Sequence, residues 1–412
     1  MMLPLKPAFA AFAAITALSA SLIMPDSLVA ATFGDDLAFM RQHVEVLLLS
    51  DTRGKSQIAV VPSYQGRVMT STASGPSGTS FGWINRNLIA SRKPQRHINA
   101  FGGEERFWMG PEGGQFSIFF KKGDPFDLAH WQTPPVVDTD RYEIKKQTPQ
   151  SVQFQHSAQF ENYSGFRFQV EIDRKITLLP RGKVSSLLGV ADLSTLEFVG
   201  YESRNTLKNA GPAAWTKQTG LLSIWILGML NPGPQTTVVL PYRRGPDSKL
   251  GPVVNDSYFG KIPSDRLQIA RDVIFFKGDG QQRGKIGLSP ARAKPLVGSY
   301  DPSERILTLV QFSIPKLAVD YVNSMWEVQK EPFKGDVVNS YNDGPPTPGA
   351  KPLGPFYELE TSSKAAALPP GDSLTHISRT FHFKGSEADL NRVSRRTLGV
   401  SIEDIRRAFN RP

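Results

Sequence analysis

The chain has 412 residues, no cysteine and a formal net charge of +10 at pH 7. Without cysteine it can form neither a disulfide nor a thiolate metal site, so its stability must come from its core. The basic residues occur in short, scattered groups without a nucleic-acid motif. This argues against nucleic acid as a partner and indicates a solvated surface that can attract anionic partners.

The first 31 residues have the features of a secretion signal. Lys6 gives a positive start, residues 8–24 are apolar and rich in alanine, and residues 29–31 are the small residues that a signal peptidase accepts. We therefore predict a signal peptide over 1–31, a mature chain from Thr32, and a periplasmic or secreted protein. A retained N-terminal anchor is the alternative. No later apolar run reaches the roughly 20 residues that a membrane span needs, so no stable membrane insertion is expected.

The mature chain is expected to begin with a short helix and to continue as β-strands. The helix is predicted over 35–43, where two acidic residues favour its N-terminus. Residues 166–172 alternate apolar and polar side chains at period two, which is typical of a half-buried antiparallel strand. Further strands are predicted at 44–49, 57–61, 67–70, 115–120, 152–160, 166–178, 196–202 and 236–240.

The fold class follows from how these runs are separated. The chain contains 35 glycines and 32 prolines, and they fall between the predicted strands. Many turns at short spacing indicate an all-β sandwich or barrel and argue against alternating strands and helices. No composition shift marks a boundary, so residues 32–385 are predicted to form one β body. Residues 386–412 are predicted to hold one amphipathic helix, over 386–409, packed on the sheet.

Four segments combine aromatic and charged side chains with loop-forming residues, as sugar sites do: aromatic faces stack on sugar rings, and charged groups bind hydroxyls. On the predicted strand 356–362, Glu358 and Glu360 share one face, where mutual repulsion can raise a pKa and suit acid–base work. An ordinary solvated strand face is the alternative. The four segments are residues 81–89, 101–108, 255–260 and 356–362.

Metal and cofactor chemistry find no support in the sequence. The six histidines include no close pair with metal-ligand spacing on a predicted helix. The glycine-rich residues 278–284 lack the spacing of a dinucleotide loop and precede no helix pattern. We therefore expect no metal site and no cofactor.

The order of the four segments resembles that of the galactose-mutarotase (aldose 1-epimerase) family, whose fold is a β-supersandwich. Within that superfamily the chain looks most similar to an uncharacterised bacterial branch, DUF6786. The resemblance spans about 44–385 and implies the same fold, galactose mutarotase-like, for this chain. It rests on Asn85-Arg86-Asn87-Leu88, Phe101-Gly102-Gly103, Asn255-Asp256-Ser257-Tyr258-Phe259-Gly260, Leu359-Glu360-Thr361-Ser362 and Pro370-Gly371-Asp372.

The resemblance implies roles for particular residues. Glu360 matches the catalytic base of the family, and Arg86 matches its sugar-binding arginine. The two histidines of the family are replaced here by Phe101 and Asp256. Ring opening of a sugar needs a base and an acid, and phenylalanine cannot donate a proton. Asp256 could do so if burial raised its pKa, and Glu105 could also reach the site.

The sequence therefore predicts an exported carbohydrate-active protein that binds a sugar or glycan, acidic glycans included, in a concave β-sheet pocket. The reaction would be epimerisation, hydrolysis or elimination with Glu360 as base, and a non-catalytic periplasmic glycan-binding protein is the alternative. An envelope protein that meets an acidic partner through its basic surface is a third reading. The predicted catalytic residues are Glu360, Asp256 and Glu105, and the predicted substrate-binding residues are Arg86, Trp83, Arg106, Trp108, Tyr258 and Glu358.

Overall fold

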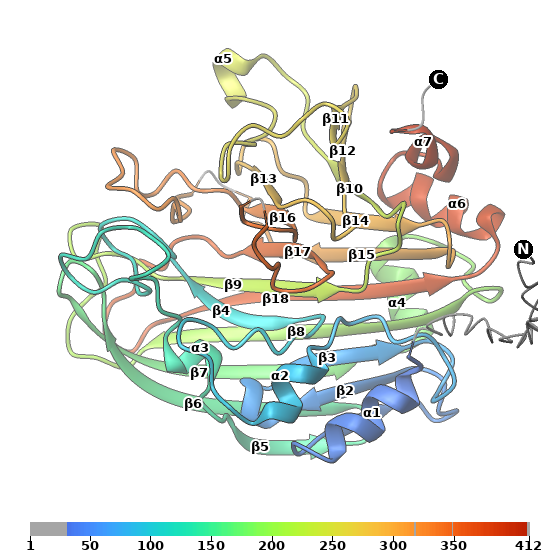
Figure 1. The fold of residues 1–412 in the computed structure, drawn as a ribbon, viewed down its shortest axis with the longest axis horizontal. Helices are drawn as coiled ribbons and strands as arrows, with labels where there is room; N and C mark the ends of the chain where they lie inside the picture. The colour runs from blue at the N-terminus through green and yellow to red at the C-terminus, as the bar shows by residue number, and fades with distance from the viewer. Residues whose placement is uncertain (1–30, 317–318, 348, 410–412) are drawn as a thin grey trace, which may run out of the picture. The chain divides into compact units, whose positions relative to one another are not determined.

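The computed structural model describes residues 31–316, 319–347 and 349–409. Within these residues the chain is mostly β, with three antiparallel sheets and a few short helices (Figure 1). The predicted all-β class with few helices is confirmed. Residues 1–30 of the predicted signal peptide lie outside the described residues. In the part that the structure describes, no helix is long and apolar enough to cross a membrane.

Ten strands form the largest sheet, in which every neighbouring pair is antiparallel. The period-two pattern of the sequence explains it: in β7, Phe168, Val170 and Ile172 are buried and the residues between them are partly exposed. The spatial order is β11 (Leu267–Ile269), β12 (Val273–Lys277), β10 (Thr237–Pro241), β14 (Leu296–Asp301), β15 (Ile306–Phe312), β18 (Ser373–Lys384), β8 (Glu197–Asn209), β7 (Arg167–Leu178), β6 (Ser151–Glu161) and β5 (Glu143–Thr148).

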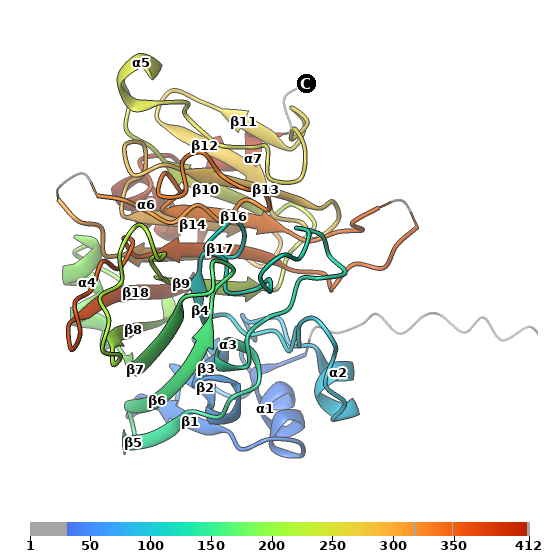
Figure 2. The same cartoon turned by 90° about the vertical axis from the view of Figure 1, so that its left-hand side faces the viewer.

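Two smaller sheets complete the β structure. The five-stranded sheet has the order β13 (Gly284–Leu288), β16 (Val338–Asn342), β17 (Tyr357–Ser362), β9 (Ser223–Leu230) and β4 (Arg106–Gly110). The three-stranded sheet has the order β1 (Leu47–Ser50), β2 (Gln57–Val61) and β3 (Arg67–Thr72). Figure 2 shows this smaller sheet beside the first helices of the chain.

The core lies between the ten-stranded sheet and the five-stranded sheet. Phe107 of β4 belongs to the same apolar cluster as Phe168 and Ile172 of β7. Further along the sheets, Leu359 of β17 packs in a cluster with Val238 of β10. Because side chains alternate along a strand, the odd-numbered residues of β17 face this core and its glutamates face away from it. The outer face of the five-stranded sheet is therefore free to form a site.

Short helices lie at the ends of this sandwich and on the outer face of the ten-stranded sheet. The predicted first helix is present but begins two residues earlier, where the Thr32 side chain accepts a hydrogen bond from the Asp35 amide. The helices are α1 (Phe33–Arg41), the 3₁₀ turn η1 (Pro62–Tyr64), α2 (Arg86–Ser91), α3 (Pro135–Asp138), α4 (Arg181–Leu188), α5 (Asp247–Leu250), α6 (Glu387–Thr397) and α7 (Ile402–Arg407).

The C-terminal segment forms two helices where one was predicted. The break follows α6, where Gly399 adopts a φ of 80° and Ser401 caps α7 by accepting a hydrogen bond from the Asp404 amide at 3.0 Å. Both helices pack on the ten-stranded sheet: Leu390 and Ile405 share a cluster with residues of β15 and β18.

Residues 115–120 form no strand, contrary to prediction. Gly114 turns the chain with a φ of 80°, and Ile118, Phe119 and Phe120 are buried in succession without alternating faces. Phe119 packs against Trp108 and Trp131, so this apolar run belongs to a packed loop. A short run of apolar residues does not by itself distinguish a strand from such a loop.

Candidate functional site

The floor of the candidate site is the outer face of the five-stranded sheet. Strand register places Arg106 and Glu360 opposite Leu227 on its two sides, and Lys285 opposite Tyr341. Alternation then puts the following side chains on one face: Arg106, Trp108, Trp225, Leu227, Met229, Lys285, Asn339, Tyr341, Glu358 and Glu360. Residues from five strands that are distant in sequence thus meet on one surface.

Two adjoining cavities lie over this floor. We call the larger one, of about 750 Å³, the outer cleft, and the smaller one, of about 250 Å³, the inner chamber. The outer cleft reaches the loop residues 95–98, 343–346 and 351–353, whereas the inner chamber reaches Ser324 and Asp336. The cavities adjoin, because both are lined by Glu112, Leu128, Trp225, Phe259, Arg283, Lys285 and Trp326.

Aromatic side chains form much of the wall. Four of the six tryptophans of the chain line the outer cleft: Trp108, Trp131, Trp225 and Trp326. Trp108 meets Trp225 edge to face at 5.6 Å, and Trp131 stacks on Trp326 at 5.8 Å between ring centroids. Such packing fixes flat apolar faces in place, and these faces can stack on a ring-shaped ligand.

Glu358 and Arg106 form a buried ion pair in the outer cleft. An Arg106 amino group donates to Glu358 Oε1 at 2.5 Å, and the guanidinium lies over the Trp108 ring. Burial raises the pKa of Glu358 to about 8, although Arg106 acts in the opposite direction; Glu360 adds to the rise. A carboxyl group with such a pKa can hold or release a proton near neutral pH.

Glu360 lies beneath the floor of the cleft. It is fully buried, and its Oε2 accepts hydrogen bonds from Trp225 Nε1 at 3.0 Å and from Lys285 Nζ at 2.9 Å. Its second oxygen, Oε1, has no hydrogen-bond partner among the described residues. Burial alone would lower the pKa of Lys285, but Glu360 and Glu112 more than offset that effect and the pKa is raised. Glu360 is therefore the counter-ion of Lys285, and the ammonium group of Lys285 lines both cavities.

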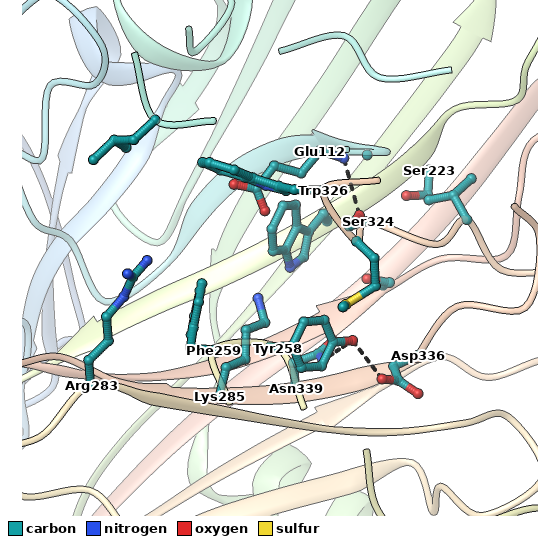
Figure 3. A pocket seen from close by; sticks show the side chains of 16 residues that line it. Glu112, Ser223, Tyr258, Phe259, Arg283, Lys285, Ser324, Trp326, Asp336 and Asn339 are labelled. Carbon is teal, nitrogen blue, oxygen red and sulfur yellow. Dashed lines mark hydrogen bonds between the residues drawn. The ribbon is translucent and has the colours of Figure 1, made fainter. Parts of the chain in front are cut away.

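Glu112 is the carboxyl group that both cavities share. It follows β4, and its amide donates to Ser324 Oγ at 3.1 Å. The chain passes closely here, because a Cβ atom at Gly113 would lie 2.4 Å from the Met325 carbonyl oxygen. Figure 3 shows Glu112 and Lys285 extending into the same space from opposite sides. Burial raises the pKa of Glu112 to about 7, while Lys285 acts against this rise.

A hydrogen-bonded group closes the far side of the inner chamber (Figure 3). Tyr258 Oη donates to Asp336 Oδ2 at 2.6 Å and accepts from Asn339 Nδ2 at 3.1 Å. Burial raises the pKa values of both Tyr258 and Asp336. Hydroxyl, amide and carboxyl groups in a partly apolar cavity are the groups that orient a polar ligand.

Of the nine residues predicted from the sequence, four line these cavities. Arg106, Trp108 and Glu358 line the outer cleft, and Tyr258 lines the inner chamber. Glu360 supports the floor from below. Trp83 supports the wall from behind, since its ring packs on Phe356 at 4.8 Å and Phe356 lines the cleft.

Three predicted residues lie elsewhere. Glu105 is enclosed between the sheets, where it pairs with Arg174 and accepts a hydrogen bond from Ser203 Oγ at 3.0 Å. Contrary to the prediction, it does not line the pocket. Asp256 pairs with Lys261 at 2.7 Å and lines neither cavity.

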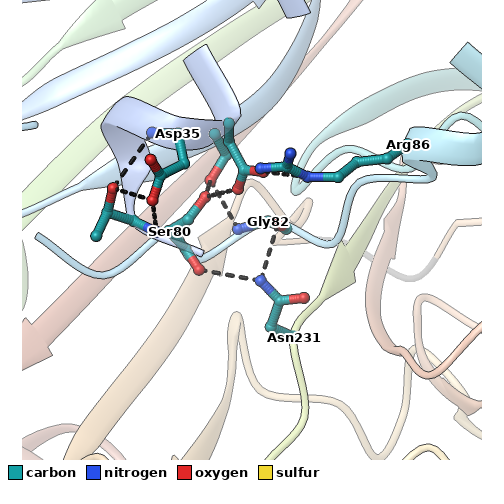
Figure 4. Close-up of polar contacts among 8 residues, drawn as sticks. Asp35, Ser80, Gly82, Arg86 and Asn231 are labelled. Atoms are coloured by element: carbon teal, nitrogen blue, oxygen red, sulfur yellow. Dashed lines mark hydrogen bonds and ion pairs between the residues drawn. The ribbon is translucent and has the colours of Figure 1, made fainter. Parts of the chain in front are cut away.

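Arg86 connects α2 to α1 in the N-terminal region of the fold. It begins α2 and forms an ion pair with Asp36 at 2.6 Å, and Asp36 also accepts a hydrogen bond from Ser80 at 2.5 Å. Figure 4 shows this network, in which Asn231 donates to the backbone oxygens of Ser80 and Gly82. Arg86 does not line either cavity, so the sugar-binding role implied by the resemblance finds no site there.

The sequence reasoning missed Glu112, Lys285 and Arg283. Two of them had a local signal: Glu112 sits among glycines directly after β4, and Lys285 is the one charged residue in the run 284–288. Neither signal is specific without the strand register. Within the described residues, no group of histidine, aspartate and glutamate side chains could hold a metal ion.

The chain belongs to a family of unknown function, DUF6786, which matches residues 31–409. The resemblance to this family that the sequence predicted is thereby confirmed. No curated protein matches the chain in sequence.

Several solved structures are similar in fold at low identity. The Slr1438 protein of Synechocystis sp. PCC 6803 is 13% identical, with a TM-score of 0.48, over 83% of this chain and 96% of its own. A galactose mutarotase-like protein of Lactobacillus casei is 9% identical, with a TM-score of 0.47, over 82% and 100%. A galactose mutarotase related enzyme of Lactobacillus acidophilus is 10% identical, with a TM-score of 0.45, over 83% and 99%. At TM-scores below 0.5, these similarities do not bear on the activity of this chain.

Proposed function

We propose that this member of the DUF6786 family is an exported carbohydrate-active protein that holds an oligosaccharide in the outer cleft. The observation that carries the proposal is the set of four tryptophans around a cavity of about 750 Å³ that also contains ionised and amide side chains. Flat aromatic faces stack on the C–H faces of sugar rings, and charged or amide groups bind the hydroxyls. A volume of this size lies within the range of about 300–1,000 Å³ that is usual for ligand pockets, so it has room for more than one sugar ring.

Acid–base chemistry on the bound sugar would come from Glu112. Its pKa near 7 lets it exist in both protonation states at neutral pH, which is what an efficient proton-transfer group requires. Glu358 offers a second carboxyl group with a raised pKa in the same cleft. Epimerisation, hydrolysis and elimination each need one group to take a proton and another to give one. Lys285 supplies a fixed positive charge beside Glu112.

A glycan-binding protein without catalysis is the second candidate. It is favoured by the position of Glu360, since the residue that the resemblance assigns as base is buried and already bound to Trp225 and Lys285. A carboxylate so enclosed must first leave both partners before it can reach a sugar. In that case the cleft would bind the glycan and release it unchanged.

The test of binding is calorimetry with a panel of neutral and acidic oligosaccharides. Trp326 lines both cavities, and loss of a stacked ring costs roughly 0.5–1.5 kcal/mol beyond its buried area, so Trp326→Ala should weaken binding about tenfold or more. Val328→Ala is the control, because Val328 is 72% exposed and lines neither cavity. Equal affinity of Trp326→Ala and wild type would place the ligand outside the cleft.

The test of catalysis is product analysis with the same panel. Glu112→Gln keeps the shape of the side chain but removes its proton exchange, so turnover should fall by about a hundredfold to ten-thousandfold while affinity changes little. Absence of any product with wild type would leave the binding protein as the function. The export that residues 1–31 motivate is tested by N-terminal sequencing of protein from the cell envelope: a chain that starts at Met1 would contradict it.

A further inference from the structure

Arg283 points into the site and forms no ion pair with a described residue. Its guanidinium carbon lies 3.8 Å from the centre of the Phe259 ring, and both residues line the outer cleft and the inner chamber. Among the described residues it makes no ion pair and no side-chain hydrogen bond. The face of the guanidinium is therefore fixed by stacking, while its five N–H donors stay available for a ligand.

Two carboxyl groups that line the outer cleft with Arg283 are already engaged or hold protons readily. Asp343 accepts hydrogen bonds from Tyr341 Oη at 2.7 Å and from the Gly354 amide at 2.8 Å. Burial raises the pKa of Glu112 to about 7, so this side chain is partly neutral at neutral pH. The charge of Arg283 lowers the pKa of both groups, but neither forms an ion pair with it. Among the described residues, the N–H donors of the guanidinium therefore have no protein acceptor.

Further cations stand along the outer cleft. Arg96 and Lys351 are exposed at its rim, and neither makes an ion pair with a described residue. The cations that line the cleft are Arg96, Arg106, Arg283, Lys285 and Lys351, and the carboxyl groups are Glu112, Asp343 and Glu358. Arg106 is hydrogen-bonded to Glu358 and Lys285 is paired with Glu360, which leaves Arg96, Arg283 and Lys351 without a carboxyl partner among the described residues.

We propose that the ligand of the cleft is an anionic oligosaccharide, and that Arg283 binds one of its carboxylate or sulfate groups, with Arg96 and Lys351 attracting further charges along the rim. The proposal rests on the carbohydrate function proposed above and names its substrate class. The aromatic walls would hold the rings and Arg283 the charge, since a guanidinium matches planar anions by paired hydrogen bonds. The net charge of +10 would draw such a polyanion to the protein from a distance.

The experiment compares charged oligosaccharides with neutral partners of the same backbone. Pentamers of galacturonate, mannuronate and glucuronate are each measured by calorimetry beside the same pentamer with its carboxylates reduced to alcohols. A sulfated galactan pentamer is measured beside its desulfated form, which separates sulfate from carboxylate as the recognised group. At least one charged member should bind about tenfold or more tightly than its neutral partner, and its advantage should shrink as salt is raised.

Arg283→Gln then assigns the effect to one residue. A hydrogen-bonded charge is typically worth about ten- to a hundredfold in affinity, so the variant should lose about that much for the charged pentamer and little for its neutral partner. Lys294→Gln is the matched control, because Lys294 is exposed and lines neither cavity. Unchanged folding is verified by the thermal unfolding midpoint of both variants.

The outcomes separate this inference from the proposed function. Neutral and charged partners that bind equally well would overturn the anionic ligand and leave the carbohydrate function standing. A charged preference that survives Arg283→Gln would overturn the role of Arg283. If neither member of any pair binds, the carbohydrate function itself fails and takes this inference with it.

Discussion

Replacing Glu360 by glutamine separates two roles for this residue, counter-ion of Lys285 and catalytic base. The amide keeps an oxygen that can accept from Trp225 but loses the negative charge 2.9 Å from Lys285 Nζ. Removing one partner of a buried ion pair costs about 3–5 kcal/mol. The Lys285 side chain is 11% exposed and borders the cavities, so water can partly solvate it. We therefore expect Glu360→Gln to lower the free energy of unfolding by about 3 kcal/mol, at the low end of that range.

The assay is a double-mutant cycle followed by urea unfolding. Lys285→Met removes the cation, and the pair Glu360→Gln with Lys285→Met leaves no unpaired charge in the floor. The double variant should therefore be more stable than the sum of the two single losses predicts, by about 2 kcal/mol. Lys294→Met serves as the control for changing an exposed lysine. Additive losses would refute the pairing of Glu360 with Lys285.

Glu105→Gln should lower the free energy of unfolding by about 3–5 kcal/mol, since Arg174 is left as an unpaired charge between the sheets. Oligosaccharide affinity in calorimetry should stay as in wild type, and a loss of affinity without a loss of stability would contradict the structural role of Glu105. The pKa of Glu112 rises from 4.5 to about 7 on folding, so between these values the folded state holds more protons than the unfolded chain and stability falls as pH rises. Glu112→Gln should remove that part of the decline in thermal unfolding measured against pH, and an unchanged profile would refute the shift.

Local patterns in the sequence predicted the strands well where one face is buried. The run 57–61 is mostly apolar and became β2, and the run 166–178 alternates and contains the whole of β7. The run 115–120 is equally apolar, yet its side chains pack in an aromatic cluster of a loop. The C-terminal helix was predicted as one because its apolar spacing continues through Gly399, where the backbone turns out of the helical region.

The candidate site was predictable where it depends on one strand and not where it depends on several. The alternation of 356–362 placed Glu358 and Glu360 on one face, and the structure has them there. That Glu360 pairs with Lys285 follows from the position of β13 two strands away, which no local pattern contains. The pKa of Glu112 is raised by burial, while Lys285 on another strand acts against this rise, and neither effect is visible in the sequence.

The two positions at which the resembling family has histidines, Phe101 and Asp256, lie away from the cleft. Phe101 stacks on Tyr64 at 4.0 Å between ring centroids, and Asp256 pairs with Lys261. Neither lines a cavity, so an acid restored at either position would not reach a ligand held there. Glu112 and Glu358 do line the cavities, and burial raises the pKa values of both. Loss of turnover in Glu112→Gln with retained binding is the result that would distinguish an enzyme that uses Glu112 from a glycan-binding protein.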